Sequence, residues 1–182
     1  NELGDDFWHE KNSLRFVDKC ETLPGPNGDE ENLCLTYGVR DGIILHCGEV
    51  DDHIIKPRNE VIDLSTITSA GQYSPYTWEG CIVKIADKIA YLGRDIEDAW
   101  NLNILNKRQL KELMKIIKVN VKESLSDINN TVIMHKFIID LCESSSPEKG
   151  IQFSKNHFDL LKELRDFSDE YIYKHERLGI YK

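Results

Sequence analysis

Residues 83–95 of the chain read VKIADKIAYLGRD, and this stretch decides the expected fold class. At about 100° per residue, the apolar side chains in and around it fall on one stripe of a helix. That stripe consists of Ile82, Ile85, Ile89, Leu92, Ile96 and Ala99. A stripe of this kind is typical of an amphipathic helix that packs against a core. The stretch therefore predicts a helix, and helical periodicity recurs along most of the chain.

A second face of this helix carries polar chemistry. Asp87, Tyr91 and Asp95 stand at i, i+4 and i+8, so their side chains form a column, and Lys88 lies beside it. The column presents a carboxylate, an ammonium group, an aromatic ring and a second carboxylate. Together these groups suit a metal ion, a phosphate, a sugar and a base. The plainer interpretation is a solvated face, because charged residues on an amphipathic helix usually face water.

Small apolar residues follow a further side of the same helix. They are Val83, Ala86, Ala90 and Gly93. This pattern predicts that the helix is packed from two directions, which leaves only a narrow polar strip. A narrow strip suits the floor of a cleft better than an open surface.

The rest of the chain predicts an all-α fold with essentially no sheet. We expect helices at 8–22, 33–47, 78–99, 107–118, 127–143 and 154–173. Thr77, Asn106, Asp127 and Ser154 are the expected helix starts, because short polar side chains cap the first backbone N–H groups. The run LPGPNG at residues 23–28 is expected to break the chain between the first two helices. We expect residues 1–182 to form a single helical domain.

Composition narrows the function classes. The net charge of −9 argues against a nucleic-acid-binding protein, which needs a basic surface. No apolar run approaches the roughly 20 residues that span a bilayer, so no membrane segment is expected. The five cysteines include no CxxC pair, which indicates reduced thiols in a cytoplasmic protein and neither a disulfide frame nor a zinc cluster. P-loop, GxGxxG, HExxH and GxSxG motifs are absent.

His9 is a second candidate site residue. It stands at an expected helix start between aromatic and charged residues. Because its pKa ordinarily lies near neutrality, a histidine in this place suits a phosphate-facing acid or donor. A partly buried structural histidine is the alternative. His46 lies near the end of an apolar helix, so a packing or capping role is expected for it.

Several separated segments resemble the deoxynucleoside triphosphate triphosphohydrolases, the dGTPase-like branch of the HD-domain phosphohydrolases. Residues 7–15 (FWHEKNSLR) are similar to that family's F-x-H-x-x-x-S segment, and residues 35–46 (LTYGVRDGIILH) to its LTYxVRDGILxH helix. Residues 77–99 look like its EGxxVxxADxIAYxxxDxEDA helix, and residues 167–175 (FSDEYIYKH) like its closing segment. The segments occur in the family's order and cover most of the chain. The resemblance implies an HD-domain-like helical bundle.

The resemblance also implies roles for the column. Asp87 occupies the place of the last aspartate of the family's H…HD…D metal set, which would bind a divalent ion such as Mg, Mn or Fe. Lys88 stands where a lysine meets the triphosphate, and Tyr91 where a tyrosine packs against the nucleoside. Asp95 stands where a carboxylate accepts the sugar 3′-OH, and His9 where a histidine approaches the phosphates and assists catalysis. The implied reaction converts a deoxynucleoside triphosphate and water to a deoxynucleoside and triphosphate.

The family's first histidine and its His-Asp pair have no counterpart in this sequence. We therefore expect the chain to be the C-terminal part of a larger HD-domain protein whose N-terminal HD segment is supplied separately. Alone, the chain is expected to bind metal poorly and to be inactive. We also expect a homo-oligomer of undefined size.

Two other interpretations stay open. The first is a different HD-type nucleotide phosphohydrolase, although Asp95 would repel a nucleotide that carries a 3′-pyrophosphate. The second is a helical regulatory or assembly module without catalysis, in which the column is ordinary surface. An H…HD pattern in the residues encoded upstream of Asn1 would settle the superfamily.

Overall fold

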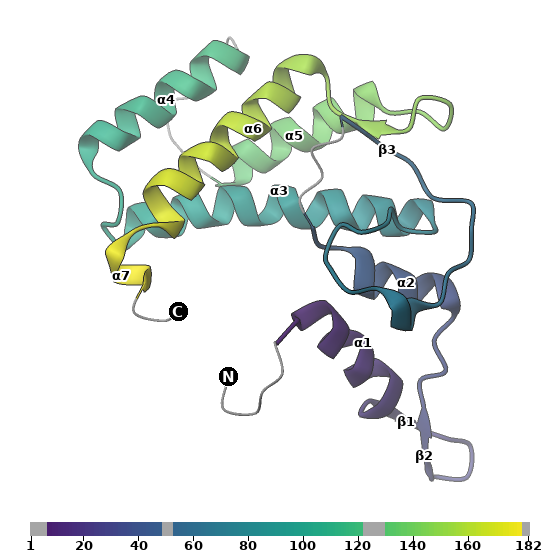
Figure 1. Cartoon of the computed structure of the whole chain (residues 1–182). Helices are drawn as coiled ribbons and strands as arrows, with labels where there is room; N and C mark the ends of the chain where they lie inside the picture. Colours follow the sequence, from purple (N-terminus) through teal and green to yellow (C-terminus); the bar gives the residue numbers. More distant parts are fainter. Residues whose placement is uncertain (1–6, 49–52, 122–129, 180–182) are drawn as a thin grey trace. The chain divides into compact units, whose positions relative to one another are not determined.

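The computed structural model describes residues 7–48, 53–121 and 130–179 (Figure 1). The helices are α1 His9–Lys19, α2 Tyr37–Leu45, α3 Trp78–Asn101, α4 Lys107–Val121, α5 Asn130–Ser144, α6 Lys155–Ser168 and α7 Glu176–Gly179. A 3₁₀ turn (η1, Leu64–Thr66) and a π-helical turn (η2, Asp169–Tyr173) add to them. The strands are very short: β1 Thr22–Pro24, β2 Glu30–Asn32, β3 Ile54–Ile55 and β4 Ile151–Gln152. The expected all-α class is confirmed, and it is the class of an HD-type bundle.

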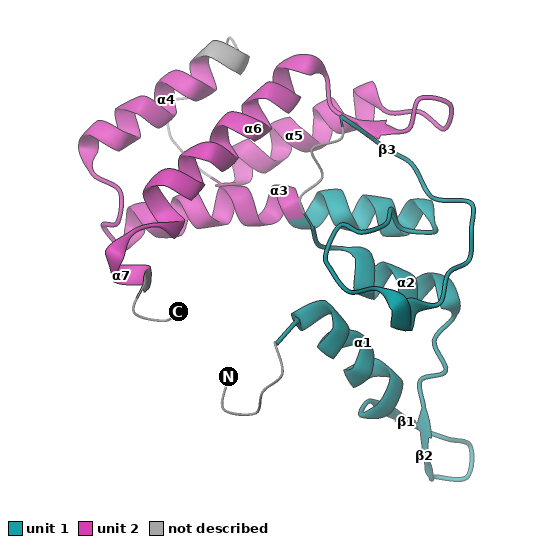
Figure 2. Ribbon diagram, in the orientation of Figure 1, with its two compact units in different colours: residues 1–87 teal, residues 88–182 magenta. Residues whose placement is uncertain are grey.

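The chain divides into two compact units, Asn1–Asp87 and Lys88–Lys182 (Figure 2). The boundary falls inside α3, which continues without interruption from one unit into the other. Because a single helix crosses the boundary, this division does not test the expected single domain, which stays a prediction.

In the first unit, α1 packs against α2 over a small apolar core. Its buried members are Leu14, Ile44, Leu45, Leu64 and Ile67. The connection between the two helices differs from the expectation of a simple break. It is an antiparallel hairpin in which β1 pairs with β2, and Thr22 lies opposite Asn32.

This hairpin shortens both neighbouring helices. The expected helix 8–22 was predicted too long, because the chain leaves α1 after Lys19 to enter β1. The expected helix 33–47 was predicted to start too early. Cys34 has a left-handed backbone with φ 48°, and its N–H donates to Asn32 Oδ1, so helix geometry begins only after Thr36.

A buried ion pair ties the long segment before α3 to α2. Asp41 is fully buried on α2, and its carboxylate accepts hydrogen bonds from the Arg58 guanidinium and from the Tyr76 backbone N–H. Arg58 also donates to the Tyr37 hydroxyl at 2.6 Å and to the Ser74 carbonyl at 2.7 Å. The described part of the segment is thus anchored at both ends, which fits the rule that buried charges are paired.

In the second unit, α4 packs along α6, and α5 lies next to β4. The predicted cap of α4 is confirmed, since Asn106 Oδ1 accepts from the N–H groups of Arg108 and Gln109. Ser154 is confirmed as the N-cap of α6. The expected helix 154–173 is α6 continued by η2, whereas the predicted start at Asp127 lies outside the described residues.

Thr77 is confirmed as the cap of α3, because its hydroxyl oxygen accepts a hydrogen bond from the Gly80 N–H at 3.0 Å. Most of the predicted apolar stripe on α3 is also confirmed. The stripe residues from Ile85 to Ala99 are all buried, but Ile82 is 53% exposed.

The expected packing from a second side is wrong for the first half of the helix, where Val83 and Ala86 are exposed. The expected packing is present at Gly93, where a Cβ would collide with Asn130 Oδ1 of α5.

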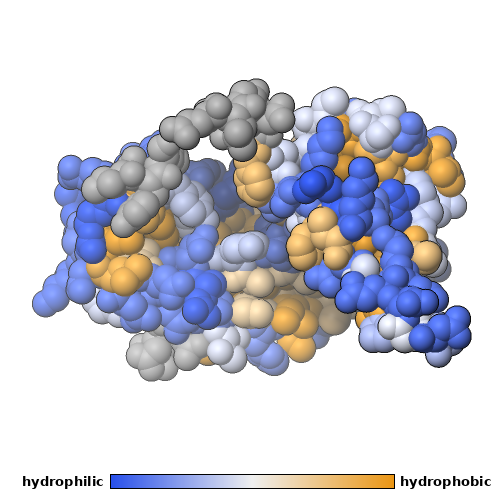
Figure 3. Space-filling view, turned by 90° about the horizontal axis from the view of Figure 1, so that it is seen from below, coloured by the Kyte–Doolittle hydropathy of each residue, from blue (hydrophilic) through white to orange (hydrophobic). Residues whose placement is uncertain are grey.

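Figure 3 shows hydrophobic areas that interrupt an otherwise largely hydrophilic face of the molecule.

Candidate functional site

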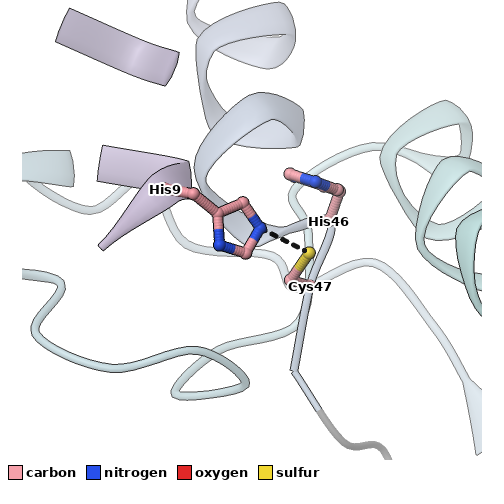
Figure 4. A group of neighbouring side chains, drawn as sticks. All are labelled: His9, His46 and Cys47. Carbon is pink, nitrogen blue, oxygen red and sulfur yellow. Dashed lines mark hydrogen bonds between the residues drawn. The ribbon is translucent and has the colours of Figure 1, made fainter. Parts of the chain in front are cut away.

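His9 is the first residue of α1, directly after the extended N-cap residue Trp8. Its side chain is 59% exposed, and its two ring nitrogens face different groups. Nδ1 lies 3.1 Å from the carboxylate of Glu10, while Nε2 lies 3.4 Å from the sulfur of Cys47 (Figure 4). The carboxylate favours a proton on Nδ1, which turns Nε2 toward the sulfur.

Cys47 connects two of the residues that the sequence marked as site candidates. Its thiol contacts His9 on one side and donates to Asp87 Oδ2 on the other, with sulfur and oxygen 3.7 Å apart. Burial, followed by the Glu10 and Asp87 carboxylates, raises the pKa of this thiol to about 12. Cys47 is therefore a protonated donor at neutral pH. The fold thus brings His9 and Asp87 into contact with the same thiol, although 78 sequence positions separate them.

His46 belongs to the same cluster. Its ring lies 6.0 Å from that of His9, centroid to centroid, in an edge-to-face arrangement. Its Nδ1 donates to the Ile43 carbonyl at 2.7 Å, so the expected capping role is present. Lys84 fixes the end of α2 beneath the cluster, because its buried ammonium group donates to the carbonyls of Leu45 and Cys47.

Sequence reasoning did not place His46 and Cys47 in the site. The available signal was their position, since His46 ends the segment that the LTYxVRDGILxH motif covers and Cys47 follows directly. What no local pattern shows is that the end of α2 meets the start of α1.

In the part of the chain that the structure describes, Asp87 does not gather a metal-ligand set. Among the described residues, the group of three or more ligand side chains close enough to hold an ion is His9, His46 and Cys47, and it does not include Asp87. Asp87 is half-buried and offers one carboxylate. The residues present do not by themselves fit the metal site that the resemblance implies.

The remaining column residues lie on the part of α3 that belongs to the second unit. Lys88 is half-buried, and the ring of Tyr91 is 61% exposed. The carboxylate of Asp95 accepts a hydrogen bond from the Tyr173 hydroxyl at the end of η2. Tyr173 lies in the closing motif of the sequence but was not predicted as a site residue.

Comparison with known proteins shows which family the chain resembles. No protein-family model matches the chain. A deoxyguanosinetriphosphate triphosphohydrolase-like protein of Desulfatibacillum aliphaticivorans is 31% identical over 93% of this chain and 41% of its own length. Proteins of the same name from Caldanaerobacter subterraneus and Clostridium tetani are each 29% identical, over 92% and 94% of this chain and 38% and 42% of their own lengths.

The chain is similar to the deoxyguanosinetriphosphate triphosphohydrolase-like family. It spans about two fifths of the length of these triphosphohydrolase-like relatives. Within its described residues, no helix is both long and apolar enough to cross a membrane.

Proposed function

We propose that the chain is part of a dNTP triphosphohydrolase, which converts a deoxynucleoside triphosphate and water to a deoxynucleoside and triphosphate. Similarity to the deoxyguanosinetriphosphate triphosphohydrolase-like proteins supports the reaction class. The observation that supports the substrate most directly is the Asp95 carboxylate, which the Tyr173 hydroxyl holds in place on the same helix as Lys88 and Tyr91. A fixed acceptor, a cation and an exposed ring together match a sugar, a phosphate and a nucleoside.

In this proposal Lys88 offsets the charge of the triphosphate. Phosphoryl chemistry depends mainly on positioning and on electrostatic stabilisation, so a cation on a rigid helix contributes to both. Asp95 accepts the sugar 3′-OH, and Tyr91 packs on the nucleoside. His9 approaches the phosphates, and its exposed ring beside the Glu10 carboxylate suits proton donation there.

Asp87 is proposed as one ligand of a divalent metal ion, Mg, Mn or Fe. Its partner ligands are proposed to come from an HD segment outside this chain, since the described residues around Asp87 offer a thiol and no second carboxylate or imidazole in ligand geometry. In this proposal the chain therefore supplies substrate binding, one metal ligand and the proton donor His9.

The test is the kinetics of four single variants in the full-length protein. We expect Asp87→Ala to abolish metal-dependent release of triphosphate, and Lys88→Ala to weaken triphosphate binding more than nucleoside binding. Asp95→Ala and Tyr91→Ala should weaken substrate binding. For Asp95, the loss of a hydrogen bond to a charged group corresponds to about 10- to 150-fold.

Glu143→Ala is the matched control, because this carboxylate is exposed on α5 in the second unit. It should leave turnover unchanged, and circular dichroism should show that every variant keeps its helices. Wild-type rates in Asp87→Ala and Asp95→Ala would contradict the proposal and favour a helical regulatory or assembly module. Release of a monophosphate product would favour a different HD-type phosphohydrolase.

A further inference from the structure

His9, His46 and Cys47 present their ligand atoms to one point between the start of α1 and the end of α2 (Figure 4). These three atoms all lie within 4.8 Å of one another, and the separation of His9 Nε2 from Cys47 Sγ is 3.4 Å. A zinc ion with N and S ligands at about 2.0–2.1 and 2.3 Å in tetrahedral geometry holds N and S about 3.6 Å apart. The His9–Cys47 pair is close to that spacing.

Both imidazoles are oriented in the way that metal-binding histidines are. His46 donates its Nδ1–H to the Ile43 carbonyl, and His9 has its Nδ1 beside the Glu10 carboxylate. Contacts of this kind fix the tautomer and leave Nε2 with its lone pair for a metal ion. The supporting groups of a metal site are therefore already in place.

Glu10 adds a buried negative charge beside the cluster. Its side chain is 1% exposed, and its Oε2 lies 3.1 Å from His9 Nδ1. A buried carboxylate is costly, and a positive charge nearby relieves that cost. Asp87, whose Oδ2 is 3.7 Å from the sulfur, adds a second carboxylate on the other side of Cys47.

We propose that His9, His46 and Cys47 bind a zinc-type transition-metal ion, at a site separate from the magnesium- or manganese-type ion expected at Asp87. A bound ion would engage Nε2 of His9 and so keep this histidine from the phosphate-facing role proposed above. One thiolate and two imidazoles select zinc or cobalt, whereas magnesium and manganese prefer oxygen ligands. Three protein ligands leave a fourth position open to water. The thiol proton leaves to solvent as the metal–sulfur bond forms.

Cobalt is the appropriate probe, because a thiolate ligand gives a sulfur-to-cobalt charge-transfer band that oxygen and nitrogen ligands do not give. We expect the reduced 182-residue chain to develop this band when Co²⁺ is added, with one ion per chain, and to lose it when Zn²⁺ displaces the cobalt. Cys47→Ser should remove the band. His46→Ala and His9→Ala should each weaken Zn²⁺ binding in a competition titration at least about tenfold.

The three exposed cysteines are the matched controls. A variant with Cys20→Ser, Cys34→Ser and Cys142→Ser should keep the band at full strength. Circular dichroism without metal should show the same helix content for all variants. The proposal is overturned if the wild-type chain gives no band, if the band survives Cys47→Ser, or if it disappears with the three exposed cysteines. Cys47→Asp provides a check that does not depend on the band, because it should still bind Zn²⁺ with the two histidines.

Discussion

The hydroxyl of Tyr173 donates a hydrogen bond to the carboxylate of Asp95, which lies 78 positions earlier in the chain. Asp95 stands in the second half of α3, and Tyr173 ends the π-helical turn that follows α6. The bond therefore joins the first and last parts of the second unit at a residue proposed to bind substrate. It fixes the direction of a carboxylate that a helix surface alone would leave free to rotate.

Tyr173→Phe should lower the free energy of unfolding by roughly 0.5–1 kcal/mol, because a typical hydrogen bond contributes about that much and this one is partly exposed. In the full-length protein the same change should raise KM for the nucleotide more than it lowers kcat, since the Asp95 carboxylate would lose the bond that orients it. Urea unfolding of the chain and steady-state kinetics measure the two effects.

Tyr171→Phe is the control for this experiment. The hydroxyl of Tyr171 contacts the Glu112 carboxylate at 3.3 Å on an exposed surface, away from Asp95. It should change neither KM nor the unfolding midpoint. Equal effects of the two substitutions on KM would show that the Tyr173–Asp95 bond does not position the substrate.

Asp41→Ala should destabilise the chain by about 3–5 kcal/mol, because it leaves the Arg58 guanidinium buried without its counter-charge. The two side chains are 0% and 8% exposed. The surface pair Arg94–Asp98, with exposures of 67% and 49%, is the comparison, and Arg94→Ala should leave the urea midpoint unchanged. A small effect of Asp41→Ala would mean that the long segment before α3 is not held by this ion pair.

The cysteines should fall into two reactivity classes toward iodoacetamide. The folded state raises the pKa of Cys47 to about 12 and that of Cys81 to about 11, in both cases mainly through burial. A raised pKa leaves less thiolate at a given pH, so these two thiols should react slowly at pH 8 and faster as the pH rises toward those values. Exposed Cys20, Cys34 and Cys142 should react first.

Peptide mass spectrometry of timed samples would separate the five sites. Zn²⁺ should protect Cys47 further at every pH and leave Cys142 unaffected, since bound metal occupies the sulfur. Rapid labelling of Cys47 at pH 8 in the folded chain would contradict the buried, carboxylate-flanked environment that the structure gives it.

Local sequence determined the helices and most of their starts. Side chains spaced three and four residues apart must share a helix face, so the buried stripe of α3 and the column Asp87, Tyr91 and Asp95 followed from spacing alone. The caps at Asn106 and Ser154 were predictable for a similar reason, because an N-cap bonds to N–H groups only two or three residues away. The predicted helix boundaries were wrong where the chain forms contacts outside the helix, as in the β1–β2 hairpin.

Tertiary structure decided which chemical groups meet. The contact of Cys47 with both His9 and Asp87, and the bond from Tyr173 to Asp95, join residues tens of positions apart. Periodicity carries no information about such pairs, because it describes directions within one helix and not which helix ends the chain brings together. The same limit applies to burial of Asp41: its motif was visible in the sequence, but its partner Arg58 was fixed only by the path of the segment that leads to α3.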